Sequence, residues 1–381
     1  MTSLKVGRNS SIEFLKIVAL FFIVISHVSQ SFGQTPIELK SLSYPFLDLN
    51  NATHSVQLLT ASLLRYLGEI GNAIFLVCSF SFLCMQKDVN KYKVIKVGTM
   101  ILDVWVVNLV FLLIYLLVGE CVSKNMIVRS CLPTLHGNNW FVTCYIIVYL
   151  IFPGLNAVIG FMSKKAHLLT CIVTLLVYDG IVFFKGVSLF YSDLIQFVII
   201  YFVVAYMKLY LPSFCCNKKI NFALAFFSLC GIIGMLVVTN MLGLHSHEFA
   251  DKLLKWKVNN NPFILLLGIS MFNIVSTRSF VNPVINYVAG LSLLIYLIHE
   301  NILFRSYTRV RICGYLLEKY GDAYLVMMII SVAFLVLLTS ILFATIYKET
   351  LHRIVVLMSK QIGKIFGKMG NIFLEKIMKL S

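Results

Sequence analysis

The most constraining feature of this chain is a succession of long apolar runs separated by polar breaks. Crossing the hydrocarbon core of a bilayer takes about 20 largely apolar residues, and about ten runs of that kind occur. Because an open strand cannot satisfy its backbone in lipid, we expect each run to be a helix. The runs fall near residues 12–32, 60–86, 97–119, 139–162, 167–184, 193–211, 220–243, 262–278, 283–304 and 322–347, of which the fifth and eighth are short. The sequence predicts an all-α, polytopic integral membrane protein of about ten transmembrane helices.

The charge of the chain supports a membrane protein. Only 13% of the 381 residues are charged, against about 25% in a soluble domain, which argues against a soluble globular protein, a disordered chain and a nucleic-acid-binding domain. The net charge of +16 therefore points first to the phosphate headgroups of the cytoplasmic leaflet. Up to residue 220, the loops on the side of the N-terminus carry eleven Lys and Arg residues and the loops on the other side carry four, so we expect both termini to be cytoplasmic.

One segment departs from the excess of Lys and Arg in the cytoplasmic loops. Residues 305–322 place four basic side chains in a predicted outer loop: Arg305, Arg309, Arg311 and Lys319. Either this loop binds an anion or the number of helices is wrong by one.

The chain is expected to divide into a transmembrane part, residues 1–347, and a basic tail, residues 348–381. In the tail Lys360, Lys364 and Lys368 recur every four residues, and apolar residues fill the other side. This pattern is typical of an amphipathic helix on an anionic membrane surface. We expect the tail to anchor the protein and to take no part in chemistry.

The first apolar run contains three ionisable residues: Glu13, Lys16 and His27. Each such group at membrane depth costs roughly 2.5 to 3.5 kcal/mol on insertion scales, which makes it a functional candidate. Lys16 and His27 are eleven residues apart, within about 20° of three whole helical turns and about 16 Å along the axis. Glu13 can pair with Lys16 on the same stripe. Glu13 and Lys16 alone could be an interfacial pair, whereas His27 needs a partner or an aqueous cavity.

Other candidate sites are weaker. His245, His247 and Glu248 have a metal-ligand spacing but no companion cluster, so no metal site is predicted. Cys121 and Cys131 could form a disulfide if their stretch faces an oxidising compartment. His299 and Glu300 end the ninth run at a depth similar to that of His27, which would suit one polar chamber.

Four stretches in order resemble the membrane-bound acyltransferase-3 family, the O-acyltransferases of bacterial cell-envelope glycans. They are S-I-E-F-L-K-I-V-A-L-F-F-I-V-I-S-H (11–27), G-E-I-G-N-A-I-F-L-V-C-S-F-S-F-L (68–83), W-F-V-T-C-Y-I-I-V-Y-L-I-F-P-G-L-N (140–156) and L-S-L-L-I-Y-L-I-H-E-N (291–301). The resemblance covers about residues 8–347. Lys16 stands where the family usually has Arg.

The resemblance implies transfer of an acetyl or other short acyl group from cytoplasmic acyl-CoA to a sugar hydroxyl of a surface or exopolysaccharide, or of its lipid-linked or nascent precursor, in the bacterial inner membrane. His27 would be the general base, with Lys16 and Glu13 beside the donor path; direct transfer and an acyl-histidine intermediate both remain open. Coenzyme A is polyanionic, so the donor would meet Lys91, Lys93 and Lys96. The acceptor would meet Trp140, Tyr145, His299, Glu300 and Asn301.

Two other classes remain as alternatives: a flippase or transporter for an envelope glycan, and a glycan polymerase. A flippase needs no proton acceptor at the depth of His27 and often shows duplicated halves. A polymerase would normally carry a larger outer loop.

Overall fold

The structure, a computed structural model, describes residues 8–32, 52–86, 91–180, 192–243 and 261–363. Every regular element within these ranges is helical, which confirms the all-α prediction. Residues 351–363 form a last helix after α16. The elements are α1 (Ser10–Phe32), α2 (Ala52–Leu83), α3 (Lys91–Leu117), α4 (Lys124–Cys131), α5 (Trp140–Phe161), α6 (Lys164–Thr174), η1 (Leu175–Gly180), α8 (Asp193–Tyr210), α9 (Pro212–Cys216), α10 (Lys218–Gly243), α12 (Pro262–Ser276), α13 (Pro283–Gly290), α14 (Ser292–His299), η2 (Phe304–Arg309), α15 (Val310–Tyr320), η3 (Asp322–Tyr324) and α16 (Leu325–Glu349).

Seven of the described helices are long and apolar enough to cross a membrane: α1, α2, α3, α5, α8, α10 and α16. The chain is therefore a multi-pass membrane protein by length and composition, while the predicted count of about ten spans is not confirmed. Three of the predicted runs form shorter helices. α6 has 11 residues before the π-helical turn η1, α12 has 15 residues, and the run 283–304 is broken between α13 and α14.

Side-chain hydrogen bonds mark both ends of α13. The Asn282 side chain accepts hydrogen bonds from the first amides of α13, and Pro283 occupies its first turn. At the other end of α13 the Ser292 hydroxyl donates to the Ala289 carbonyl oxygen at 2.6 Å, and the chain turns at Leu291. As a result α14 is a short helix that ends at His299 within the protein.

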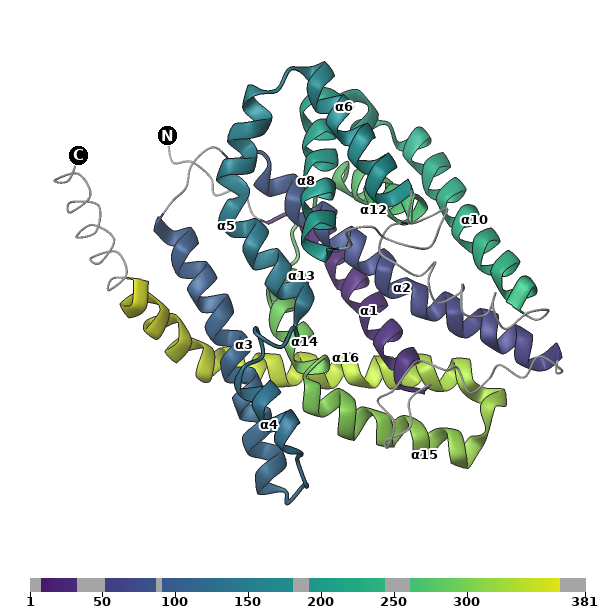
Figure 1. The fold of residues 1–381 in the computed structure, drawn as a ribbon, viewed down its shortest axis with the longest axis vertical. Helices are drawn as coiled ribbons and strands as arrows, with labels where there is room; N and C mark the ends of the chain where they lie inside the picture. The colour runs from purple at the N-terminus through teal and green to yellow at the C-terminus, as the bar shows by residue number, and fades with distance from the viewer. Residues whose placement is uncertain (1–7, 33–51, 87–90, 181–191, 244–260, 364–381) are drawn as a thin grey trace.

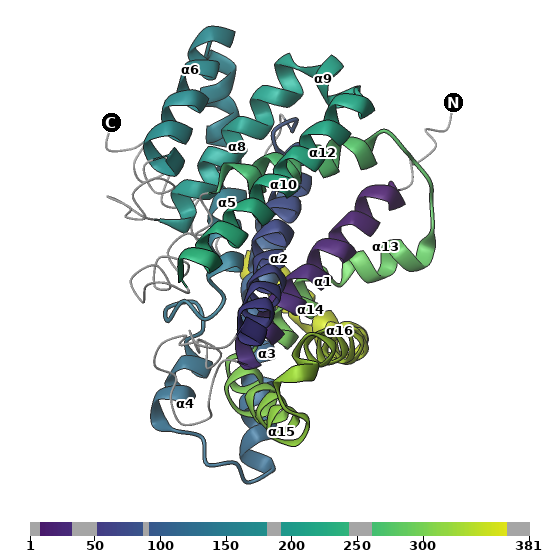
Figure 2. The ribbon, with the colours of Figure 1, turned by 90° about the vertical axis from the view of Figure 1, so that its right-hand side faces the viewer.

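α1 is the central helix of the bundle. Figures 1 and 2 show α1 and α2 side by side, and Figure 1 shows α16 crossing near the C-terminal end of α1; α1 also packs against α12, α13 and α15. Gly71 permits the close approach of α1 and α2, since a Cβ atom there would lie 2.5 Å from the Ala19 carbonyl oxygen. Ala19, Val24 and Val28 are fully buried. The central position of α1 brings its polar stripe against several other helices.

Residues 305–322, which the sequence predicts to be a loop, are largely helical. The segment forms η2 and α15, and α15 buries Val310 and Cys313 at helical spacing against the bundle. Arg309, expected in solvent, is only 3% exposed. The basic residues of this segment follow an amphipathic pattern that loop counting does not detect.

Candidate active site

His27 meets the end of α14 inside the bundle. Its Nδ1 atom lies 2.9 Å from Glu300 Oε2 and 3.2 Å from His299 Nε2. His299 is fully buried and Glu300 nearly so, whereas the side chain of His27 is 21% exposed. His27 and His299, which the sequence predicts at similar depth, are in contact.

The hydrogen bonds indicate which nitrogen of His27 can accept a proton. His299 Nδ1 lies 2.8 Å from the Ile295 carbonyl oxygen, which can only accept, so that Nδ1 donates and Nε2 of a neutral His299 is an acceptor. Glu300 and His299 then both accept from Nδ1 of His27. Because both contacts use Nδ1, Nε2 of a neutral His27 keeps the basic lone pair.

Two arginines hold the Glu300 carboxylate. Arg305 Nη1 donates to Oε1 at 2.6 Å and Arg309 Nη1 donates to Oε2 at 3.2 Å. Arg309 also donates to the His299 carbonyl oxygen at 2.9 Å and to Ser31 Oγ at 2.8 Å, which links this group to the end of α1. The two guanidinium groups compensate a buried carboxylate and fix its orientation toward His27.

Asn301 positions the arginines. Its side-chain oxygen accepts hydrogen bonds from the backbone amides of Leu303 and Phe304, which begin the turn that carries Arg305 and Arg309. Its amide nitrogen donates to Asn108 Oδ1 on α3 at 3.3 Å. The side chain predicted to contact the acceptor is thus engaged in holding the chain around Glu300.

His27, His299 and Glu300 have ligand-type atoms within 4.8 Å of one another, a grouping that could hold a metal ion. The surrounding charges oppose this, because a divalent cation would lie beside both arginines that bind Glu300. We interpret the cluster as a hydrogen-bonded one. The predicted absence of a metal site at residues 245–248 concerns a segment outside the described residues.

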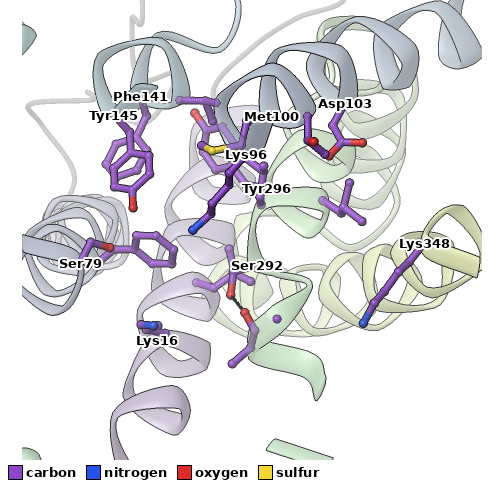
Figure 3. A pocket seen from close by; sticks show the side chains of 18 of the residues that line it. Lys16, Ser79, Lys96, Met100, Asp103, Phe141, Tyr145, Ser292, Tyr296 and Lys348 are labelled. Atoms are coloured by element: carbon purple, nitrogen blue, oxygen red, sulfur yellow. Dashed lines mark hydrogen bonds between the residues drawn. The ribbon is translucent and has the colours of Figure 1, made fainter. Parts of the chain in front are cut away.

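A chamber of about 510 Å³ extends along the same stripe of α1 (Figure 3). Lys16, Leu20 and Ile23 line it in succession, and His27 follows Ile23 by one turn without lining it. The polar lining includes Arg8, Lys16, Ser79, Lys96, Thr99, Asp103, Tyr145, Ser292, Tyr296, Lys348 and His352. We call the part around Arg8, Lys16, Lys96 and Lys348 the cationic end, and the part around Ile23, Phe141 and Tyr296 the deep end.

The predicted donor-binding residues lie partly at the cationic end. Lys16 lines the chamber and its Nζ atom lies 3.3 Å from Glu13 Oε1, as expected for an ion pair on one stripe. Lys96 also lines it, and its Nζ lies 5.2 Å from the centroid of the Tyr149 ring. The side chains of Lys91 and Lys93 lie outside the described residues.

The predicted acceptor-binding residues separate into groups. Tyr145 lines the chamber, and His299 and Glu300 contact His27. Trp140 points elsewhere: its ring packs against Phe197 and lines a different, small cavity.

Several site residues were missed from sequence. The sequence predicts Arg305 and Arg309 in an outer loop, although their spacing of four directly after H-E-N would place them on one helical face beside Glu300. Lys348 and His352 line the chamber from the segment predicted to be only an anchor. Cys121 and Cys131, which could have paired, are both free thiols.

A family model described as an acyltransferase domain matches residues 9–348, which include α1, α14 and nearly all of the chamber. No curated protein and no solved structure matches the chain significantly. The match covers nearly the whole chain and confirms the resemblance carried by the four sequence stretches. The chain belongs to the acyltransferase-3 family.

Proposed function

We propose that this protein transfers an acetyl or other short acyl group from acyl-CoA to a sugar hydroxyl of a bacterial envelope polysaccharide or of its lipid-linked precursor. The observation that carries the proposal is the continuity of α1: one stripe runs from Lys16 at the cationic end, past Ile23 at the deep end, to His27. The roughly 16 Å between Lys16 and His27 suits an extended donor with an anionic head and a reactive thioester.

His27 is the general base in this proposal. Nε2 takes the proton of the sugar hydroxyl as its oxygen attacks the thioester carbonyl carbon, and the carbon–sulfur bond then breaks. The proton passes from His27 to the departing thiolate, which leaves as free CoA. Glu300 stabilises the imidazolium that forms between these steps and keeps Nδ1 protonated throughout.

The deep end of the chamber lies between the donor path and His27. Tyr296 packs against Phe141, with ring centroids 5.9 Å apart, and against His299, with ring centroids 5.6 Å apart. The thioester must pass this layer of Ile23, Phe141 and Tyr296 to reach Nε2. Excluding water there would protect the thioester from hydrolysis until the acceptor is bound.

The proposed site faces the cytoplasm at its cationic end, with the protein in the bacterial inner membrane and both termini inside. The helix 351–363 supports an interfacial position, because it exposes Ile354, Leu357 and Met358 beside Arg353 and Lys360. This pattern suits anionic lipids. Residues 364–381, which carry Lys364 and Lys368, lie outside the described residues.

The direct test uses the purified full chain in lipid nanodiscs, radiolabelled acetyl-CoA and envelope glycan from cells that lack the protein. We expect label to enter the glycan as an ester that mild base removes, and mass spectrometry should show the same ester only in cells that have the protein. Unchanged glycan mass in both strains, together with movement of glycan across the membrane, would favour the transporter alternative.

A further inference from the structure

A buried carboxylate on α3 joins the chamber to the tail. Asp103 is 2% exposed and lines the chamber. Its Oδ1 atom accepts hydrogen bonds from the Tyr347 hydroxyl at 3.0 Å and from His352 Nδ1 at 2.9 Å. These partners come from the last turn of α16 and the start of the helix 351–363, so the carboxylate fixes the point where the tail leaves the bundle.

The helix 351–363 continues to pack along α3. Val355 and Ser359 are each 2% exposed, and the Ser359 hydroxyl donates to the Ile95 carbonyl oxygen at 2.7 Å. Gly98 leaves the room for this contact, because a Cβ atom there would lie 2.8 Å from Ser359 Oγ. The first part of the tail is therefore a docked element of the chamber wall.

The docked helix begins beside an accumulation of positive charge. Lys348 Nζ lies 4.0 Å from the centroid of the Tyr287 ring, and Lys96 Nζ lies over Tyr149. Among the described residues neither lysine forms an ion pair with a carboxylate. Figure 3 shows Lys16, Lys96 and Lys348 around the chamber from three different helices. Like charges gathered around one cavity repel one another until an anion binds between them.

We propose that Lys348 and His352 form a binding subsite for the phosphate groups of the donor, and that the docked helix 351–363 positions this subsite. The inference rests on the proposed acyl-CoA donor and deepens it. Lys348 supplies a charge, and protonated His352, whose Nδ1 donates to Asp103, presents Nε2 as a second donor, to phosphate oxygen. Asp103 and Ser359 are positioning residues.

The test compares the affinities of two probes, coenzyme A and pantetheine, for the purified full chain in nanodiscs. Pantetheine has the thiol arm of coenzyme A and no phosphate. We expect Lys348→Ala to weaken coenzyme A binding by about tenfold, the loss of one charge-assisted contact, and to leave pantetheine binding unchanged. Lys348→Arg should restore most of the affinity. Arg353→Ala is the matched control, since Arg353 is a nearby cation on the docked helix 351–363 that pairs with Glu349 and does not line the chamber.

A second variant tests the positioning by the tail. Gly98→Val should push Ser359 off α3, which raises KM for acetyl-CoA and leaves kcat near the wild-type value. Equal weakening of coenzyme A and pantetheine binding by Lys348→Ala would overturn the phosphate subsite, and so would no weakening of either. If the wild-type protein binds no coenzyme A, the proposed donor fails and this subsite with it; wild-type binding with an unaffected Lys348→Ala variant overturns the subsite alone.

Discussion

In the described part of the chain, two buried carboxylates each lie 2.9 Å from a histidine Nδ1: Glu300 with His27 and Asp103 with His352. The pairs differ in what else holds the carboxylate and in which element carries the histidine. Arg305 and Arg309 bind Glu300, whereas a tyrosine hydroxyl completes the contacts of Asp103. The same pairing can therefore orient a base in one place and fasten a helix in another.

The difference between the histidines lies in their helices. His27 belongs to α1, which is enclosed by several helices, so its position is fixed by the whole bundle. His352 belongs to the helix 351–363, which exposes most of its apolar side chains and is held to α3 along one face. We expect chemistry to depend on the first pair and donor affinity on the second.

The largest expected effect is that of His27→Ala. Because the substitution removes the proposed base without changing the apolar pattern, the rate of acyl transfer should fall by roughly 10² to 10⁴ while the protein still inserts. His352→Ala in the same assay should raise KM for acetyl-CoA and leave kcat near the wild-type value. The measurement is steady-state transfer to glycan by both purified variants.

Gln30→Ala is the control for membrane insertion, because it removes another polar side chain of α1. The Gln30 side chain donates a hydrogen bond to Ser26 Oγ. Wild-type transfer by a normally inserted His27→Ala variant would remove His27 from the chemistry, and the two histidine pairs would then not differ in role.

Glu300→Gln should have the next largest effect. The amide keeps the shape but leaves buried Arg309 without its charge partner, which we expect to destabilise the protein by on the order of 3 kcal/mol. The loss of the ion pair with Arg305 contributes less to this destabilisation, because the Arg305 side chain is 34% exposed. Loss of the group that orients His27 should also lower kcat at least about tenfold in the folded fraction. Thermal unfolding and transfer assays together measure both effects.

Glu120→Gln is the matched control for Glu300→Gln. Glu120 also pairs with an arginine, Arg311, but that pair is at the surface. Its loss should change neither kcat nor the unfolding temperature appreciably. A comparable loss of activity in both variants would mean that the arginine pairs act through general stability.

A smaller effect is expected at the cationic end. Lys16→Arg should keep the affinity for acetyl-CoA, and Lys16→Glu should lower it about tenfold, because reversing the charge repels the donor phosphates and leaves Glu13 unbalanced. Equilibrium binding of acetyl-CoA to both variants measures the change in affinity. Lys165→Glu on α6 is the control, because Lys165 does not line the chamber. Equal affinity of Lys16→Glu and wild type would leave Lys16 as an interfacial side chain only.

The parts predictable from sequence are those contained in one helix. The stripe of Glu13, Lys16 and His27 follows from helical periodicity alone, and the structure keeps all three on the expected face. The contact of His27 with His299 could be anticipated from equal depth. Both inferences need only the position of a residue along a span.

The parts that could not be predicted depend on how the chain turns between helices. The residues on both sides of Leu291 are mostly apolar, so hydropathy gives no sign that the chain turns there. Arg309 falls between two apolar runs and is therefore predicted in a loop, because the sequence does not show that the face carrying Val310 and Cys313 is buried. The contact of His352 with Asp103 joins residues far apart in sequence. An isolated Asp in an apolar run does not indicate which residue it will contact.

The smallest expected effect is the dependence of tail docking on pH. The hydrogen bond to the Asp103 carboxylate raises the pKa of His352 above its ordinary value, against the opposing effects of burial and of the Lys348 charge. Because the pKa of His352 is raised in the folded state, protonation of His352 stabilises the docked tail. This stabilisation is complete below the pKa of an unfolded-chain histidine, about 6.5, and is lost as the pH rises through the folded-state pKa. Hydrogen exchange of residues 351–363, corrected for the intrinsic rate, should therefore speed up in wild type as the pH rises above about 6.5. The increase should be absent in His352→Gln, whose side chain does not titrate, and α12 should show none in either protein. An identical pH response in wild type and His352→Gln would mean that the histidine on the tail does not fasten the helix, and the contrast with the pair at Glu300 would rest on the arginines alone.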